Sequence, residues 1–67
     1  MTIKEIKAVL KDLIKDEWVV FEDASDKKYF LDLIKTEDLE TVFSELEVSN
    51  FTNKNLVEDI REEYESL

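Results

Sequence analysis

The 67-residue chain contains no cysteine, no histidine, no glycine and no proline. Without cysteine and histidine it has no disulfides, no zinc-finger ligands, no thiol nucleophile and no imidazole for acid–base catalysis. Without glycine it lacks the backbone positions that Walker loops, dinucleotide-binding motifs and EF-hand loops require. These absences exclude the common catalytic and cofactor-binding motifs, so we expect a protein that is not an enzyme and binds no cofactor.

Long hydrophobic runs are absent as well. The longest uninterrupted apolar run is Trp18 to Phe21, far shorter than the roughly 20 residues of a membrane-spanning helix. The first residues also lack the apolar stretch of a signal peptide. We therefore expect a soluble protein without a membrane partner, and the lack of cysteine favours the cytoplasm.

Residues 2–16 have the spacing of an amphipathic helix. Apolar side chains recur every three or four residues, and lysines and acids fill the other positions; the apolar positions are Ile3, Ile6, Leu10, Leu13 and Ile14. Thr2 and Glu5 have the spacing of a capping box, in which each side chain accepts a hydrogen bond from the backbone of the other. The sequence therefore predicts a helix that begins just after Thr2.

Residues 18–34 favour a β-hairpin. A β-branched and aromatic run, Trp18 to Phe21, is followed by a polar stretch and then by a second apolar run, residues 29–34. Tyr29, Leu31 and Leu33 would share one face of the second strand. The alternative makes 27–35 a helix, with Phe30, Leu33 and Ile34 on its buried side, and the missing glycine in the turn favours that alternative.

The C-terminal half returns to helical spacing. Residues 37–47 predict a helix capped by Thr36, and a last helix is expected to begin after Thr52 and to bury Leu56, Val57, Ile60 and Tyr64. The predicted order is α-β-β-α-α in one α+β domain, residues 1–67, with the helices packed on a two-stranded antiparallel hairpin. If 27–35 is helical, the domain is instead an all-α four-helix bundle.

Charge is distributed unevenly along the chain. The net charge is −9, yet residues 1–17 hold four acids and four bases, so the whole excess lies in residues 18–67. Residues 37–67 hold only two bases, Lys54 and Arg61, against ten acids: Glu37, Asp38, Glu40, Glu45, Glu47, Glu58, Asp59, Glu62, Glu63 and Glu65. With the apolar stripes of the two C-terminal helices facing inward, these carboxylates are expected to form continuous acidic surface.

An acidic surface of this kind does not bind DNA or RNA directly, because affinity for nucleic acid comes from protein cations that release counterions. It suits a basic protein that binds nucleic acid. The sequence therefore suggests a non-catalytic inhibitor that imitates a nucleic-acid backbone and occupies the basic groove of a nucleic-acid-processing protein. We predict that the ten carboxylates make the contact and that Trp18 and Phe21 add apolar anchors.

In size and composition the chain is similar in kind to the small acidic inhibitors that phages and mobile elements direct against nucleases or CRISPR effectors, although no motif ties it to a named family. Two alternatives stay open. The acids can serve solubility alone, or the chain can be a structural or regulatory module, a homodimer or complex subunit, that binds through an apolar face of the hairpin.

Other chemistry has little support in the sequence. Residues 22–26 carry Glu22, Asp23 and Asp26, whose oxygens suit a divalent cation, but their spacing matches no calcium loop and is typical of an ordinary turn. Carboxylate pairs such as Asp59 and Glu63 lack an apolar cleft that would separate their pKa values. We therefore predict no metal site and no catalytic residue.

Overall fold

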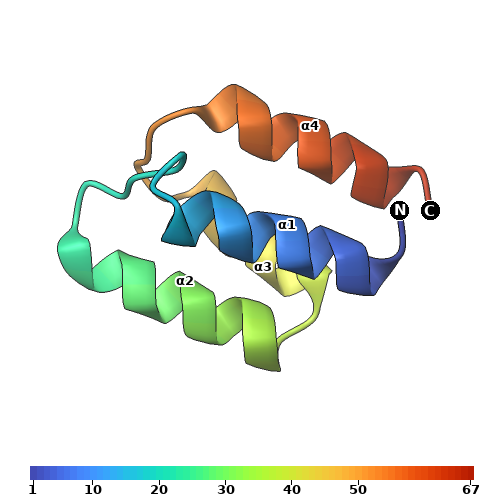
Figure 1. The fold of residues 1–67 in the computed structure, drawn as a ribbon, viewed down its shortest axis with the longest axis horizontal. Coiled ribbons are helices and arrows are strands. Elements are labelled where there is room, and N and C mark those ends of the chain that lie inside the picture. The colour runs from blue at the N-terminus through green and yellow to red at the C-terminus, as the bar shows by residue number, and fades with distance from the viewer.

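The computed structural model describes all 67 residues, and it contains four helices. These are α1 (Ile3–Lys15), α2 (Ala24–Thr36), α3 (Leu39–Glu47) and α4 (Lys54–Glu65). Helix α1 lies between α2 and α4 and contacts both, while α3 packs against α2 (Figure 1). Helices α2 and α4 therefore occupy opposite sides of α1.

Helix α1 forms as the sequence predicts. The Thr2 hydroxyl accepts a hydrogen bond from the Glu5 backbone N–H at 3.2 Å, and the Glu5 carboxylate accepts one from the Thr2 N–H at 3.1 Å. This capping box satisfies two of the backbone donors that every helix start leaves unpaired. Ile6, Leu10 and Ile14 are the buried residues of the helix.

The predicted α+β hairpin is wrong, and the alternative all-α arrangement of four helices is confirmed. The second half of the supposed hairpin lies inside α2, where Phe30 and Ile34, four residues apart, are buried. The polar stretch before it is a helix start rather than a turn, because the Asp23 side chain caps the Ser25 N–H at 3.0 Å. A glycine-free chain lacks the residues that a tight hairpin turn requires, whereas a helix start needs only the aspartate.

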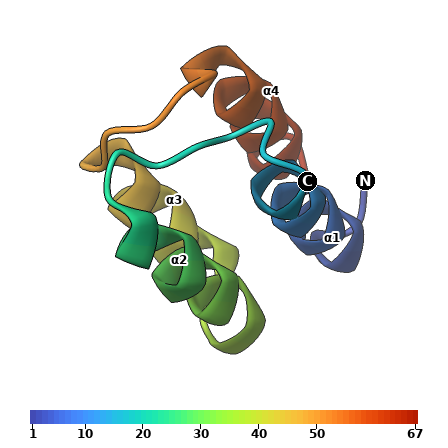
Figure 2. The same ribbon diagram turned by 60° about the vertical axis from the view of Figure 1, so that its left-hand side comes forward.

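The run from Trp18 to Phe21 is extended, but its partner is the connection between α3 and α4. One antiparallel bridge joins Phe21 to Phe51, with hydrogen bonds from Glu22 N–H to Asn50 O at 3.1 Å and from Thr52 N–H to Val20 O at 3.0 Å. The two connections approach each other at one end of the molecule (Figure 2). This pairing of segments 30 residues apart holds the α1–α2 connection against the α3–α4 connection.

Two predicted caps are also wrong. Helix α3 is capped by Asp38, whose carboxylate accepts from the Thr41 N–H at 2.8 Å, while Thr36 donates its hydroxyl to Asp32 O at the end of α2. Thr52 does not cap α4, because its hydroxyl accepts from the Val20 N–H at 3.0 Å. The residue before α4 is Asn53, which has left-handed backbone angles and donates its side-chain amide to Trp18 O.

One core of 13 buried apolar residues draws on all four helices and on the extended segment. Phe30 is its largest fully buried side chain, and the Phe30 ring stacks on that of Phe21 with the ring centroids 4.7 Å apart. No polar or charged residue is buried. Every carboxylate of the chain is therefore left at the surface, and the helices decide which of them lie together.

Candidate interaction surface

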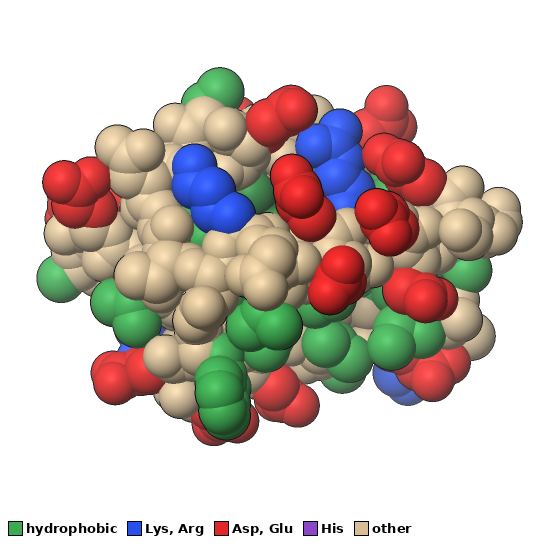
Figure 3. All heavy atoms as spheres, turned by 90° about the horizontal axis from the view of Figure 1, so that it is seen from above, with side chains coloured by type: hydrophobic (Ala, Val, Ile, Leu, Met, Phe, Trp, Pro, Cys, Tyr) green, Lys and Arg blue, Asp and Glu red, His purple; other side chains and the backbone are tan.

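Helix α4 carries the densest set of carboxylates. Val57 and Ile60 are its buried residues, Leu56 and Tyr64 are half-buried, and its acids are all exposed. Helical geometry places Glu58, Glu62 and Glu65 in one row and Asp59 and Glu63 in another, with neighbours in a row about 6 Å apart along the axis. Figure 3 looks onto this side of the molecule, where carboxylates gather over the C-terminal half of α4.

Arg61 neutralises part of this surface. Its guanidinium contacts Glu47 of α3 at 3.3 Å and Glu65 of α4 at 3.2 Å. The hydrogen bond and charge of Glu47, with a smaller effect of Glu65, raise the pKa of Arg61 above its ordinary value. Of the ten predicted carboxylates, these two are therefore already paired within the chain.

The acids on and before α3 are mostly occupied in other ways. Asp38 is the N-cap, and its hydrogen bond from the Thr41 backbone lowers the pKa of that carboxyl. Glu45 accepts from the Tyr29 hydroxyl at 3.5 Å. The backbone carbonyl of Glu37 accepts from Lys7 Nζ at 3.0 Å. The Glu37 and Glu40 side chains are exposed and make no hydrogen bond or ion pair.

Four carboxylates of α4 have no partner in the chain. The side chains of Glu58, Asp59, Glu62 and Glu63 are exposed and take part in no hydrogen bond or ion pair. We call these four residues the α4 acidic face. Their charges are available to a partner without breaking an internal contact, which distinguishes them from Glu47, Glu65, Asp38 and Glu45.

The structure separates the two predicted aromatic contacts. Trp18 is 60% exposed and Val20 is 47% exposed, whereas Val19 and Phe21 are 2% and 7% exposed. The alternation expected for an extended segment is present, but Phe21 belongs to the core and lies outside the candidate surface. Trp18 is the large apolar side chain that this segment presents to solvent.

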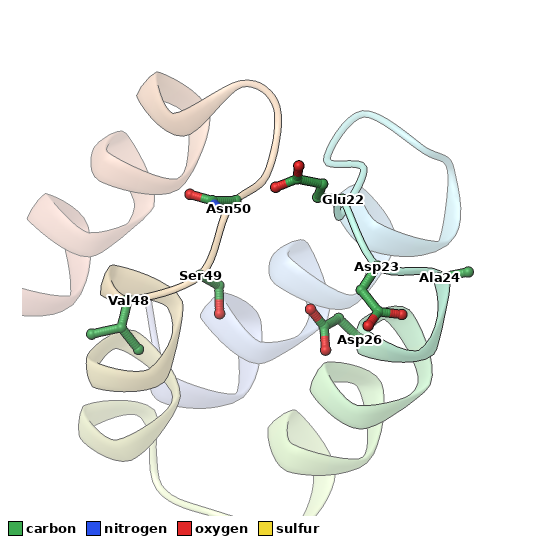
Figure 4. Close-up of a pocket in the computed structure, with 7 residues that line it drawn as sticks. All are labelled: Glu22, Asp23, Ala24, Asp26, Val48, Ser49 and Asn50. Atoms are coloured by element: carbon green, nitrogen blue, oxygen red, sulfur yellow. The ribbon is translucent and has the colours of Figure 1, made fainter.

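The acids of residues 22–26 line a shallow hollow of about 520 Å³, together with Val48, Ser49 and Asn50 from the α3–α4 connection (Figure 4). In the close-up Asp23 and Asp26 lie next to each other at the start of α2, and Glu22 lies apart from them on the α1–α2 connection. Asp23 is committed to Ser25, whose N–H and hydroxyl both donate to Oδ1 at 3.0 and 2.8 Å. No group of three or more possible metal ligands comes together anywhere in the chain.

Sequence reasoning missed three contacts that shape this surface. Arg61 lies four residues before Glu65, a spacing that predicts a helical ion pair, but its link to Glu47 depends on how α3 and α4 pack. Asp38 directly precedes the first apolar residue of its helix, which is an ordinary cap signal. The contact between Tyr29 and Glu45 had no signal, because it joins two helices across 16 residues.

Comparison with protein-family models, with curated proteins and with solved structures found no match to the chain. None of the four helices combines the length and apolarity needed to cross a membrane. The function must therefore be argued from the chain's own surface.

Proposed function

We propose that the protein is a non-catalytic binding protein whose α4 acidic face imitates the charge of a nucleic-acid strand and occupies the basic groove of a nucleic-acid-processing protein. The observation that carries the proposal is the set of four exposed, unpaired carboxylates on a single helix. The proposal keeps the cytoplasmic placement that the sequence suggests, and it includes inhibitors of the phage or anti-CRISPR type.

The charge pattern of α4 supports a role beyond solubility. Helix α1 also repeats one charge at four-residue spacing, with Lys7, Lys11 and Lys15, but its four lysines and two acids give it a net charge of +2, which opposes the −9 of the whole chain. Helix α4 instead stacks Glu58 with Glu62 and Asp59 with Glu63, and like charges four residues apart destabilise a helix by a few tenths of a kcal/mol per pair. Mixed charges would give solubility without that cost, so the arrangement is better explained by a basic partner.

The mechanism is competition by charge. A net charge of −9 creates a field that accelerates encounter with a basic groove, and carboxylates in the complex pair with Lys and Arg that would otherwise contact phosphates. Because the α4 acidic face has no internal partners, binding replaces only water and counterions. The predicted hairpin face of the alternative module does not exist, so we do not propose a homodimer through it.

The decisive experiment replaces Glu58, Glu62 and Glu63 by Gln and compares the variant with the wild type in affinity capture from a bacterial lysate. We expect the wild type to retain nucleic-acid enzymes and to release them to excess duplex DNA or to about 0.3 M salt, where screening shortens to a few ångströms. For a purified target, loss of three exposed charge contacts should weaken binding roughly three- to a hundredfold.

The matched control replaces Asp12, Asp16 and Asp32 by Asn, which removes the same number of charges from α1, its C-terminal cap and α2. Asp32 lies on the helix opposite α4. Circular dichroism should be unchanged in both variants. If the two variants lose equal affinity, net charge rather than the α4 acidic face determines binding; if neither loses any, the proposal is wrong.

A further inference from the structure

A second surface lies on the edge of the extended segment that faces away from residues 50–52. A hollow of about 220 Å³ is formed there by the end of α1, the extended segment and the start of α2. Its apolar wall comes from Ile14 and residues 19–21, and its charged rim holds Glu17, Glu22, Asp23 and Lys27. The hollow is smaller than the roughly 300–1,000 Å³ of drug-sized ligand sites, and it has room for one aliphatic side chain.

The backbone along this edge is incompletely paired. The Phe21–Phe51 bridge is flanked by the hydrogen bonds of Glu22 and Val20, so Phe21 is a non-hydrogen-bonded position and its own N–H and C=O point away from residues 50–52. The Val19 N–H, on the same edge, reaches Leu13 O at the end of α1 at 3.0 Å. Neither backbone group of Phe21 has a partner in the chain.

Phe21 is 7% exposed as a residue, and because its backbone N–H and C=O have no partner in the chain, strand addition at this edge would break no internal hydrogen bond. Next to Phe21 the segment leaves Trp18 and Val20 exposed. An extended peptide that adds to this edge would satisfy both backbone groups and cover apolar surface at the same time, as in other cases of strand addition.

Charge identifies the occupant. Acid pairs bracket the segment on both sides, Asp16 and Glu17 before it and Glu22 and Asp23 after it. Lys27 offsets one of them through its 3.7 Å contact with Glu17. A second copy of the chain, itself carrying −9, would bring like charges together, which opposes association. A segment rich in Lys or Arg is complementary.

We propose that this edge is a docking site for an extended, cationic segment of the basic partner, which pairs with the Phe21 backbone and inserts one apolar side chain into the hollow. The inference rests on the proposed function, since it assigns a second contact to the same partner. At this docking site the partner is held by short-range backbone and apolar contacts with the α1–α2 connection, while the α4 acidic face attracts it over a longer distance.

The test uses the blocked heptapeptide Lys-Val-Lys-Val-Lys-Val-Lys as probe, with the fluorescence of Trp18, the sole tryptophan of the chain, as one readout. We expect a saturable shift of the Trp18 emission at 0.15 M salt. In NMR spectra the amide signals of residues 18–23 should move, and exchange of the Phe21 amide with solvent should slow. The peptide Lys-Pro-Lys-Pro-Lys-Pro-Lys has the same charge but forms no strand, and it should cause neither change.

Variants separate this site from the α4 acidic face. Replacing Glu17 and Glu22 by Gln should weaken binding of the valine peptide about threefold or more, whereas the Glu58, Glu62 and Glu63 to Gln variant should change it less than twofold. The inference is overturned if the peptide leaves Trp18 unaffected, if it mainly shifts amides of α4, or if the proline peptide acts equally. Those results would not affect the proposed function, which the lysate experiment tests separately.

Discussion

Two residues have left-handed backbone angles although the chain has no glycine: Glu17 with φ 60° and Asn53 with φ 57°. Glu17 follows α1 and its C-terminal cap Asp16. Its N–H is bonded to Ile14 O at 3.3 Å, and it occupies the position that glycine usually takes after a helix. Asn tolerates this conformation better than most residues, and Asn53 also donates its amide to Trp18 O. The glycine-free composition thus imposes a local cost at Glu17 that Asn53 largely avoids.

We predict that Glu17→Gly stabilises the protein by roughly 0.5–1 kcal/mol, because glycine adopts a positive φ without a side-chain clash. The exposed contact with Lys27 that it removes is worth little. Urea unfolding followed by circular dichroism measures the change. Asn53→Gly is the control: it keeps the left-handed position but removes the link to Trp18, so it should give no gain. A loss of stability in Glu17→Gly would contradict this account.

At the scale of elements, three acids of this chain cap the starts of helices. Glu5, Asp23 and Asp38 accept backbone hydrogen bonds at the starts of α1, α2 and α3, and these bonds lower the pKa of each carboxyl. Sequence spacing predicted the Thr2–Glu5 cap, because both partners lie within one turn. It gave the wrong cap for α3, although Asp38 directly before Leu39 is a local cap signal. It gave the wrong cap for α4 and a hairpin in place of α2, because residues 20–22 pair with residues 50–52, a contact that no local pattern reveals.

The cap carboxylates make stability depend on pH in a defined direction. A folded-state pKa below the unfolded value means that the contribution is complete above about pH 4 and is lost as the pH falls through the folded pKa. The double variant Asp23→Asn and Asp38→Asn keeps side-chain caps that do not titrate. In urea titrations between pH 7 and pH 3, the stability of the variant relative to wild type should rise below about pH 4. A constant difference across that range would show that these carboxylates do not titrate as caps.

At the scale of the molecule, the sequence predicted which residues are acidic surface better than it predicted how the chain folds. Apolar spacing alone places Val57 and Ile60 inward and Glu58, Glu62 and Glu63 outward, whatever α4 packs against. The partners of Arg61, the core position of Phe21 and the hollow beside it depend on contacts between distant segments, which periodicity does not specify. The candidate interaction surface was therefore predictable as a set of residues, but not its division into paired and unpaired carboxylates.

The same unpaired charges predict a conflict between stability and binding. With a net charge of −9 and three exposed ion pairs, repulsion within α4 is relieved chiefly by salt. Replacing Glu58, Glu62 and Glu63 by Gln should therefore raise the melting temperature by about 2–6 °C at low ionic strength, and the gain should shrink as salt increases toward 0.5 M. Thermal unfolding at several salt concentrations, with the Asp12, Asp16 and Asp32 variant as control, measures this.

A gain in stability that accompanies a loss of partner binding would show that the carboxylates which oppose the folding of α4 are the ones that recognition needs, a trade-off between stability and function. If the Gln variant is no more stable than wild type at low salt, the repulsion is negligible and the like-charge rows carry no cost. In that case solubility would explain the α4 acidic face as well as a basic partner does, and the proposed function would depend on the binding data alone.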